Sequence, residues 1–233
     1  NRSLQEFRAS VLPWDTADFD LVGTSVCSTW TALRVLELNA IPRPGGRGSS
    51  ILPSSKLEPS SAAPLLSGIE KRLNDHARFE PTIVELILRN LKLDDEPVAT
   101  AILGLSGRRS LRCLRLLDLS GNNVNERVCA ALADSIVVDA DAVEMRERSA
   151  LPGLVELHLP SNGIDGAAMW RLVTALRAAA ADHSRNGTPC LRLLDLRHNR
   201  APREVVTAMQ TCRVPVAPAA WIPRLHKRSQ RVA

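Results

Sequence analysis

Leucine recurs along the chain in the spacing L-x-x-L-x-L, and many of the positions between the leucines are polar. Alternation of apolar and polar residues predicts a short β-strand with one buried face. Five segments carry this spacing, the second with isoleucine in the first position: residues 33–38, 83–88, 114–119, 154–159 and 191–196. Apolar residues then recur at helical spacing, as at Val128, Leu132 and Ile136. Each unit is therefore predicted to be a strand, a turn and a helix.

An asparagine follows each of the last three strands at the same offset, at Asn122, Asn162 and Asn199. An amide side chain both donates and accepts hydrogen bonds, so it can satisfy turn backbone that neither sheet nor helix satisfies. We expect these three residues to form an internal structural ladder. The first two copies carry Ile41 and Leu91 at this position, which predicts a weaker ladder and an irregular N-terminal half.

The five copies agree in phase, and the pattern resembles the leucine-rich repeat superfamily, with a strand-plus-helix unit most similar to the ribonuclease-inhibitor type. The resemblance covers residues 31–213. It implies an α/β solenoid of about five repeats, with parallel strands on the concave face and helices on the convex face. The family's unit has about 20–29 residues. Three repeats here are longer, so we expect insertions at 42–64, 138–150 and 179–189.

The rest of the chain divides around these repeats. Residues 1–30 contain several aromatic residues and are interpreted as an N-terminal cap over the open end of the core. Within the solenoid of 31–213, residues 42–64 are rich in Pro, Gly and Ser and predict a flexible insertion. Residues 214–233 are interpreted as a basic, Pro-containing C-terminal tail.

The residues between the leucines are expected to lie on the concave face and to point to solvent. They carry more carboxylates than arginines, although the whole chain has a formal net charge of +5 at pH 7. Aliphatic side chains lie beside the carboxylates, so the face is expected to bind a basic amphipathic protein segment. The alternative is a solvated acidic strip without a partner. The candidate protein-binding residues are Glu37, Glu85, Ile87, Leu116, Asp118, Glu156, His158, Leu193 and Asp195.

His158 lies between Asp118 and Asp195 when the strands are aligned, an arrangement that could hold a metal ion or form an acid–base pair. The strand columns offer no second histidine or cysteine as a zinc ligand, which favours a surface histidine beside two carboxylates. Residues 182–184 (Asp-His-Ser) are consecutive in an expected loop, and residues 44–48 lack the elements of a phosphate loop. The sequence therefore predicts no catalytic residue, no metal, no cofactor and no small-molecule substrate.

Basic residues gather in two clusters, one before the third predicted strand and one in the tail. The chain has 30 Lys and Arg against 25 Asp and Glu, and nearly all of the basic residues are arginines. Such clusters either neutralise phosphates without sequence preference or serve solubility alone, and the sequence leaves both readings open. The candidate residues for RNA or anion binding are Arg108, Arg109, Arg112, Arg224, Lys227, Arg228 and Arg231.

These features predict a non-enzymatic scaffold, a protein-interaction subunit of a large assembly. The arginine excess favours a ribonucleoprotein such as an organellar (mitochondrial) ribosome, and the alternative is a regulatory or cytoskeletal module, for instance an axonemal one. Expected partners are other protein subunits, with RNA at the basic clusters. No apolar run reaches the roughly 18–20 residues of a spanning helix, so no membrane insertion is expected. Five scattered cysteines predict an intracellular, reducing compartment, either the mitochondrial matrix or the cytoplasm and cytoskeleton.

Overall fold

The computed structural model describes residues 3–10, 16–40, 62–74, 83–106, 114–136, 154–186, 191–200, 202 and 205, and all structural statements concern these residues. Strands and helices alternate along them. The elements are β1 (Glu6–Ser10), α1 (Thr16–Ser28), β2 (Val35–Asn39), α2 (Ala63–Asn74), β3 (Glu85–Arg89), α3 (Asp95–Ser106), β4 (Leu116–Asp118), α4 (Glu126–Ile136), β5 (Glu156–His158), α5 (Gly166–Asn186) and β6 (Leu193–Asp195).

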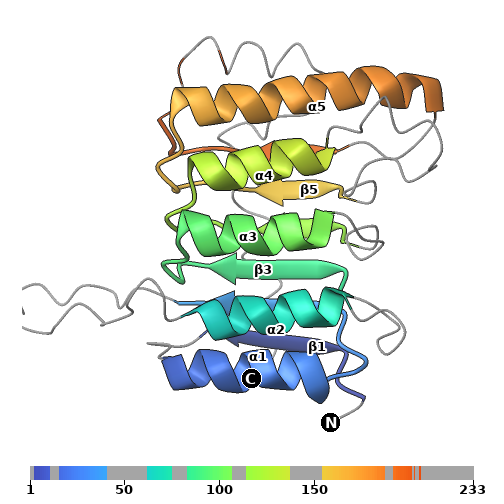
Figure 1. Cartoon of the computed structure of the whole chain (residues 1–233), viewed down its shortest axis with the longest axis vertical. Coiled ribbons are helices and arrows are strands. Elements are labelled where there is room, and N and C mark those ends of the chain that lie inside the picture. The colour runs from blue at the N-terminus through green and yellow to red at the C-terminus, as the bar shows by residue number, and fades with distance from the viewer. Residues whose placement is uncertain are drawn as a thin grey trace, which may run out of the picture.

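The described strands form one parallel, six-stranded sheet in which the spatial order of the strands equals their chain order. Parallel neighbours need a crossover connection, and here a helix lies between each pair of successive strands. Figure 1 shows that the helices stack in the same order along the sheet. The chain is thus an α/β protein with a parallel sheet whose strands alternate with helices.

The register aligns the leucine positions of neighbouring strands. Leu86 lies beside Leu36 on one side and Leu117 on the other, and the row continues through Leu157 to Leu194. All five side chains are buried. Because successive strand residues point to opposite faces, a slip of one residue would bury the polar positions instead. The repeated leucine spacing therefore determines the strand pairing.

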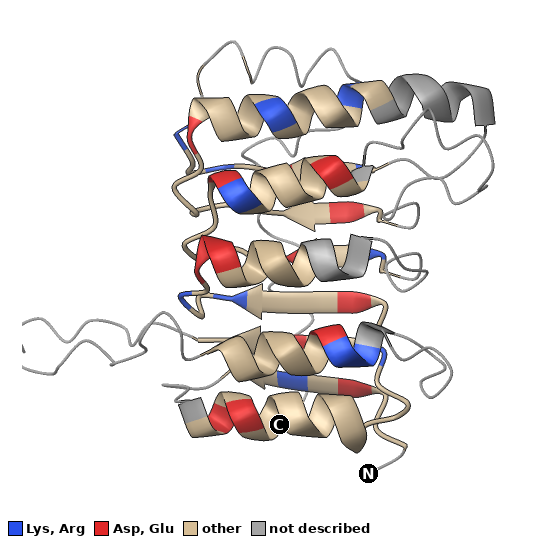
Figure 2. Cartoon of the chain, viewed as in Figure 1, with Lys and Arg blue, Asp and Glu red and all other residues tan. Residues whose placement is uncertain are grey.

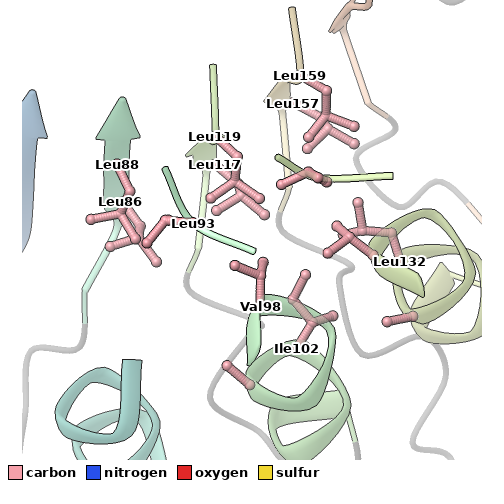
Figure 3. Packing of buried hydrophobic residues seen from close by; sticks show 14 of the residues in the cluster. Leu86, Leu88, Leu93, Val98, Ile102, Leu117, Leu119, Leu132, Leu157 and Leu159 are labelled. Carbon is pink, nitrogen blue, oxygen red and sulfur yellow. The ribbon is translucent and has the colours of Figure 1, made fainter. Parts of the chain in front are cut away.

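The apolar core lies between the sheet and the helices, as Figure 3 shows from close by. There, Leu117 of β4 and Leu119, the residue after β4, face Val98 and Ile102 of α3 and Leu132 of α4. In Figures 1 and 3 the described helices lie on the same side of the sheet. The opposite side carries no described helix, and we call it the open face.

Lys92 and Gly163 have a left-handed backbone, and so does one residue at the same position in the turn after each of the last four strands. These four turn residues have φ between 56° and 68°: Asn90, Gly121, Ser161 and His198. A Cβ at Gly121 would lie 2.0 Å from Oδ1 of Asn90, so the Asn90 side chain would have to move to accommodate it. The turn conformation therefore repeats from unit to unit together with the strand.

Residues 1–30, expected to be a cap, supply a strand and a helix of the same layers. Strand β1 pairs in parallel with β2, with Phe7 beside Leu36 and Ala9 beside Leu38. The segment also covers the end of the core, since the rings of Phe7 and Trp30 lie 4.5 Å apart and both pack against it. The sheet thus has one strand more than the five segments predicted.

Two expected insertions have different boundaries in the structure. Ala62 is buried in the core and α2 begins at Ala63, so the last residues of the expected insertion 42–64 belong to the fold. Helix α5 continues to Asn186, so most of the expected loop 179–189 is helical, including residues 182–184. Residues 42–61 and the expected insertion 138–150 lie outside the described residues.

Helices α1 and α2 approach each other closely at two glycines. A Cβ on Gly68 would lie 2.2 Å from the carbonyl oxygen of Gly23. One turn further along α2, the side chain of Arg72 is buried at 1% exposure, and burial lowers its pKa to about 10. Its guanidinium donates hydrogen bonds to four backbone carbonyl oxygens in the last turn of α1 and in the segment that joins α1 to β2: Val26, Trp30, Thr31 and Leu33.

Candidate functional site

The open face carries two complete rows of side chains that cross all six strands. Row 1 comprises Glu6, Val35, Glu85, Leu116, Glu156 and Leu193. Row 2 comprises Arg8, Glu37, Ile87, Asp118, His158 and Asp195. All nine residues predicted to bind protein lie in these two adjacent rows, so the strand register brings them together on one surface.

Most of row 2 is buried, which corrects the expectation that its side chains point into solvent. Asp118 is 2% exposed, Asp195 3% and His158 7%. Ile87 is also buried. Strands lie only about 4.8 Å apart, so longer side chains on neighbouring strands cover the shorter ones in the middle of the face. A buried charged group needs hydrogen-bond or ion-pair partners, and Asp118, His158 and Asp195 each have them.

Asp118 is held by an arginine and a serine. Its Oδ2 lies 2.6 Å from Nη2 of Arg89, whose Nη1 lies 3.7 Å from Oε1 of Glu37. Its Oδ1 accepts hydrogen bonds from the backbone N–H and the hydroxyl group of Ser120. The carboxylate is therefore saturated within its own part of the sheet, and substituting it would leave Arg89 without its main partner.

His158 is a buried cation in a carboxylate cage, not the surface histidine expected from the sequence. Its Nε2 lies 3.2 Å from Oε2 of Glu156, and its Nδ1 lies 3.9 Å from Oδ2 of Asp195. Burial alone would lower the pKa of His158, but the carboxylates of Asp195 and Glu156 outweigh it and raise the pKa to about 9. The histidine is thus protonated at neutral pH and is a poor general base there.

The two carboxylates beside His158 are ionised for the same reason. Burial alone would raise the pKa of Asp195, but His158 and Arg197 hold it well below its usual range. Nη2 of Arg197 lies 2.5 Å from Oδ2 of Asp195, and Nε donates to Oδ1 at 2.8 Å. The hydrogen bond with His158 lowers the pKa of Glu156. These four residues form a self-neutralised charge cluster.

Sequence reasoning missed Arg8, which neutralises the N-terminal part of the face. Its Nη1 lies 2.5 Å from Oε2 of Glu37, its Nε 3.3 Å from Oε2 of Glu6, and its Nη2 3.8 Å from Oε2 of Glu85. Residues 4–9 follow the phase of the repeats, with Phe and Ala in place of the last two leucines. A search that accepts other apolar residues at the leucine positions would therefore have located this strand and Arg8.

The most exposed carboxylates of the face lie in row 1. The side chains of Glu6, Glu85 and Glu156 are 61%, 39% and 42% exposed. Leu116 and Leu193, which lie between or beside them, are only half-buried. Another molecule can therefore reach row 1, which combines negative charge with accessible apolar surface.

The three ladder asparagines connect successive turns behind this face. Oδ1 of Asn162 accepts the N–H groups of Asn122 at 3.1 Å and Val124 at 3.2 Å, and its Nδ2 donates to the carbonyl oxygen of Leu119 at 3.0 Å. Asn199 binds the turn of Asn162 in the same way. Asn122 in turn accepts the N–H groups of Leu91 and Leu93. Each amide thus joins its own turn to the preceding one.

The predicted RNA- or anion-binding residues all lie outside the described residues, as does the Gly-rich segment 44–48. Arg115, at the start of the fourth strand segment, is described and exposed. In the part of the chain that the structure describes, no group of three His, Cys, Asp or Glu side chains could hold a metal ion. None of the described helices combines the length and the apolar character needed to cross a membrane.

Row 1 thus presents exposed carboxylates and half-buried leucines beside a row 2 that is mostly buried and paired in charge. No protein-family model matches the chain, and no curated protein matches it.

Proposed function

We propose that this protein is a non-catalytic leucine-rich-repeat scaffold that binds protein partners on the open face of its sheet. The fold part of the proposal is a solenoid with strands on the concave side and helices on the convex side. It is supported by the parallel register of the leucine positions, the recurring left-handed turn residue and the asparagine hydrogen bonds between successive turns.

The observation that carries the function is row 1 on a sheet face without described helices. Parallel sheets in proteins usually have both faces covered. Here one face is covered by helices, and the other presents exposed glutamates beside half-buried leucines. Such a surface suits an amphipathic segment whose basic side chains meet the glutamates and whose apolar side chains meet the leucines.

A scaffold role also accounts for the polar groups of row 2 better than catalysis does. Asp118, His158 and Asp195 are each bound to oppositely charged neighbours and buried. Groups paired in this way stabilise the face and set its shape, and they have no vacant position for a substrate. The arginine excess of the chain favours a ribonucleoprotein, such as an organellar ribosome, as the assembly.

The test is affinity purification of the tagged full chain from its source cells, with and without nuclease. The wild type is compared with Glu6→Lys/Glu85→Lys on row 1 and with Glu126→Lys/Asp134→Lys on exposed positions of α4. We expect protein partners that are lost from the row 1 variant and kept by the α4 variant. Partners that depend on RNA indicate the ribonucleoprotein, and nuclease-resistant ones indicate the cytoskeletal or regulatory alternative. An identical partner set for all three proteins would contradict the proposal.

A further inference from the structure

A further row of residues lies beside row 1, at the edge of the sheet where the strands begin. Successive backbone hydrogen bonds join its members side by side, each N–H donating to the carbonyl oxygen of the previous one at 2.7–2.8 Å. We call it row 0, and it comprises Gln5, Arg34, Val84, Arg115, Val155 and Arg192. Its three arginines are exposed and its two valines are half-buried. In β2 to β6, the apolar residue before row 0 and the leucine after row 1 are both buried in the core, so the two residues between them do not follow the strict alternation of a strand, and both lie outside the core.

Rows 0 and 1 together alternate in charge from strand to strand. The even-numbered strand segments begin with an arginine followed by an aliphatic residue: Arg34-Val35, Arg115-Leu116 and Arg192-Leu193. The odd-numbered ones begin with an uncharged residue followed by a glutamate: Gln5-Glu6, Val84-Glu85 and Val155-Glu156. Figure 2 shows the acidic residue at the start of β1, β3 and β5. Negative and positive side chains thus occupy alternate strands, with aliphatic ones between them.

The glutamates and the arginines of these rows differ in their partners. Glu6 and Glu85 lie within 4 Å of Arg8, and Glu156 lies within 4 Å of His158. Within the described part of the chain, the side chains of the row 0 arginines make no ion pair or hydrogen bond. The arginines are therefore free to bind an acidic partner group, while the glutamates keep enough exposure to bind a basic one.

The spacing of these charges matches an α-helix better than an extended peptide. Neighbouring strands are about 4.8 Å apart, so like charges recur about every 10 Å along the rows. Residues on one face of an α-helix recur every turn, about 5.4 Å along its axis, so the helix repeat exceeds the strand spacing by only about 0.6 Å. An extended peptide presents one face about every 6.8 Å, and its mismatch per strand is about three times larger. Long arginine and glutamate side chains absorb the smaller error over six strands.

We propose that rows 0 and 1 bind an amphipathic α-helix of a partner protein. One face of this helix carries acidic and basic residues on alternate turns, so that like charges are seven residues apart, with apolar residues between them. Crossing six strands requires about 24 Å, or about 16 residues of helix. The inference rests on the proposed docking function and adds the partner's secondary structure and charge pattern. A polyanion such as RNA fits less well, because the three glutamates repel its phosphates.

The first test uses two synthetic helical peptides of identical composition and the whole 233-residue chain. One peptide places Lys and Glu on alternate turns of one face, and the other groups the same residues into a Lys half and a Glu half. Fluorescence anisotropy gives the dissociation constant at 50 and 300 mM salt. We expect about tenfold tighter binding of the alternating peptide at low salt and a smaller ratio at high salt. Equal affinities at low salt would overturn the inference.

The second test changes the pattern on the protein. Arg34→Glu/Arg115→Glu/Arg192→Glu makes rows 0 and 1 uniformly acidic, so it should lose the alternating peptide and gain a peptide with an all-lysine face. The matched control is Arg127→Glu/Arg171→Glu/Arg177→Glu, which reverses three exposed arginines on α4 and α5 and should keep the wild-type preference. Should the first variant unfold in circular dichroism, the Arg→Gln version of the same three positions replaces it and should remove the preference between the peptides.

The outcomes separate this inference from the proposed function. Partners that depend on Glu6 and Glu85 in cells, combined with no preference between the peptides, overturn the helix inference and leave the docking function in place. An identical partner set for the row 1 and control variants overturns the docking function, and the helix inference then has no basis. A single-stranded RNA oligomer that binds at 150 mM salt through the row 0 arginines, with no peptide preference, assigns row 0 to nucleic acid instead.

Discussion

The N-terminal region, from β1 to α3, and the C-terminal region, from β4 to β6, satisfy the backbone hydrogen-bonding groups of their turns by different means. In the C-terminal region, a neutral amide in each strand-to-helix turn binds that turn to the one before it, as the amide of Asn162 does with Leu119 and Asn122. In the N-terminal region, the described helix-to-strand turn between α1 and β2 is bound by one cation, Arg72, from the neighbouring helix. The asparagine contact is repeated from turn to turn, whereas the arginine contact occurs once in the described residues.

This difference follows from the backbone groups that each turn presents. The strand-to-helix turns present both N–H and carbonyl groups, and an amide serves both kinds. The α1–β2 segment presents several carbonyl oxygens around one point, and a guanidinium with five N–H donors suits that geometry. The close contact of Gly23 and Gly68 brings α2 near enough to α1 for Arg72 to reach these carbonyl oxygens. Damage should therefore be local in the C-terminal region and more severe at the single arginine.

Arg72→Met is expected to have the largest effect on stability. It removes the donor of four carbonyl oxygens while keeping most of the side-chain volume, so the free energy of unfolding should fall by about 3 kcal/mol. Urea unfolding followed by circular dichroism measures this change. Arg171→Met, at an exposed arginine paired with Asp134, is the control and should cost no more than about 0.5 kcal/mol. A loss as small as that of the control would show that solvent satisfies this turn.

The open face should respond to pH only in its C-terminal region, where a histidine is the central cation. The folded-state pKa of His158, about 9, lies above its ordinary value of 6.5. Its stabilisation is therefore fully present below about pH 6.5 and is lost as the pH rises through 9, by about 3 kcal/mol in total. The N-terminal cation, Arg8, does not titrate in this range.

Unfolding free energies measured between pH 6 and 10 test this expectation, because the carboxylates stay ionised throughout. His158→Gln should flatten the decline that the wild type shows, and His198→Gln, at an exposed histidine, should leave it unchanged. Identical pH profiles for the wild type and the His158 variant would place the pH dependence elsewhere and contradict the buried cation.

The ladder itself gives the next effect in size. Asn162→Ala leaves the N–H groups of Asn122 and Val124 without their acceptor, so we expect a loss of about 2 kcal/mol. Hydrogen exchange should increase mainly in the turn 119–124. Asn123→Ala, at an exposed asparagine next to the ladder, serves as the control and should change stability by less than about 0.5 kcal/mol. Exchange that increases across the whole sheet would show that the damage is global rather than local.

Leucine spacing was enough to locate β2 to β6 and the ladder asparagines, because strand pairing and turn position repeat with the same phase. Strand β1 escaped that reasoning because Phe7 and Ala9 replace leucines. The continuation of α5 into the expected loop could have been predicted from its run of alanines, since alanine is the strongest helix former. Aligning the strands was enough to place His158 beside Asp195. The ion pairs of Arg8 could not be predicted, because β1 itself had not been located. Arg72 was equally unpredictable, since its role depends on how α2 packs against α1.

The junction between the two regions supplies the last and smallest effect. Asp95, the first residue of α3, accepts the N–H groups of Asn125 at 2.7 Å, Arg127 at 2.7 Å and Val128 at 3.0 Å. Its carboxylate therefore caps the start of α4 from the preceding unit, where the positive end of the helix dipole also favours it. Asp95→Ala should cost about 1 kcal/mol. Glu96→Ala, at an exposed neighbour, should cost less, and urea unfolding of both variants measures the difference. Equal losses would mean that water caps α4 as well as Asp95 does, and that Asn122 and the pairing of β3 with β4 join the two regions without help from this cap.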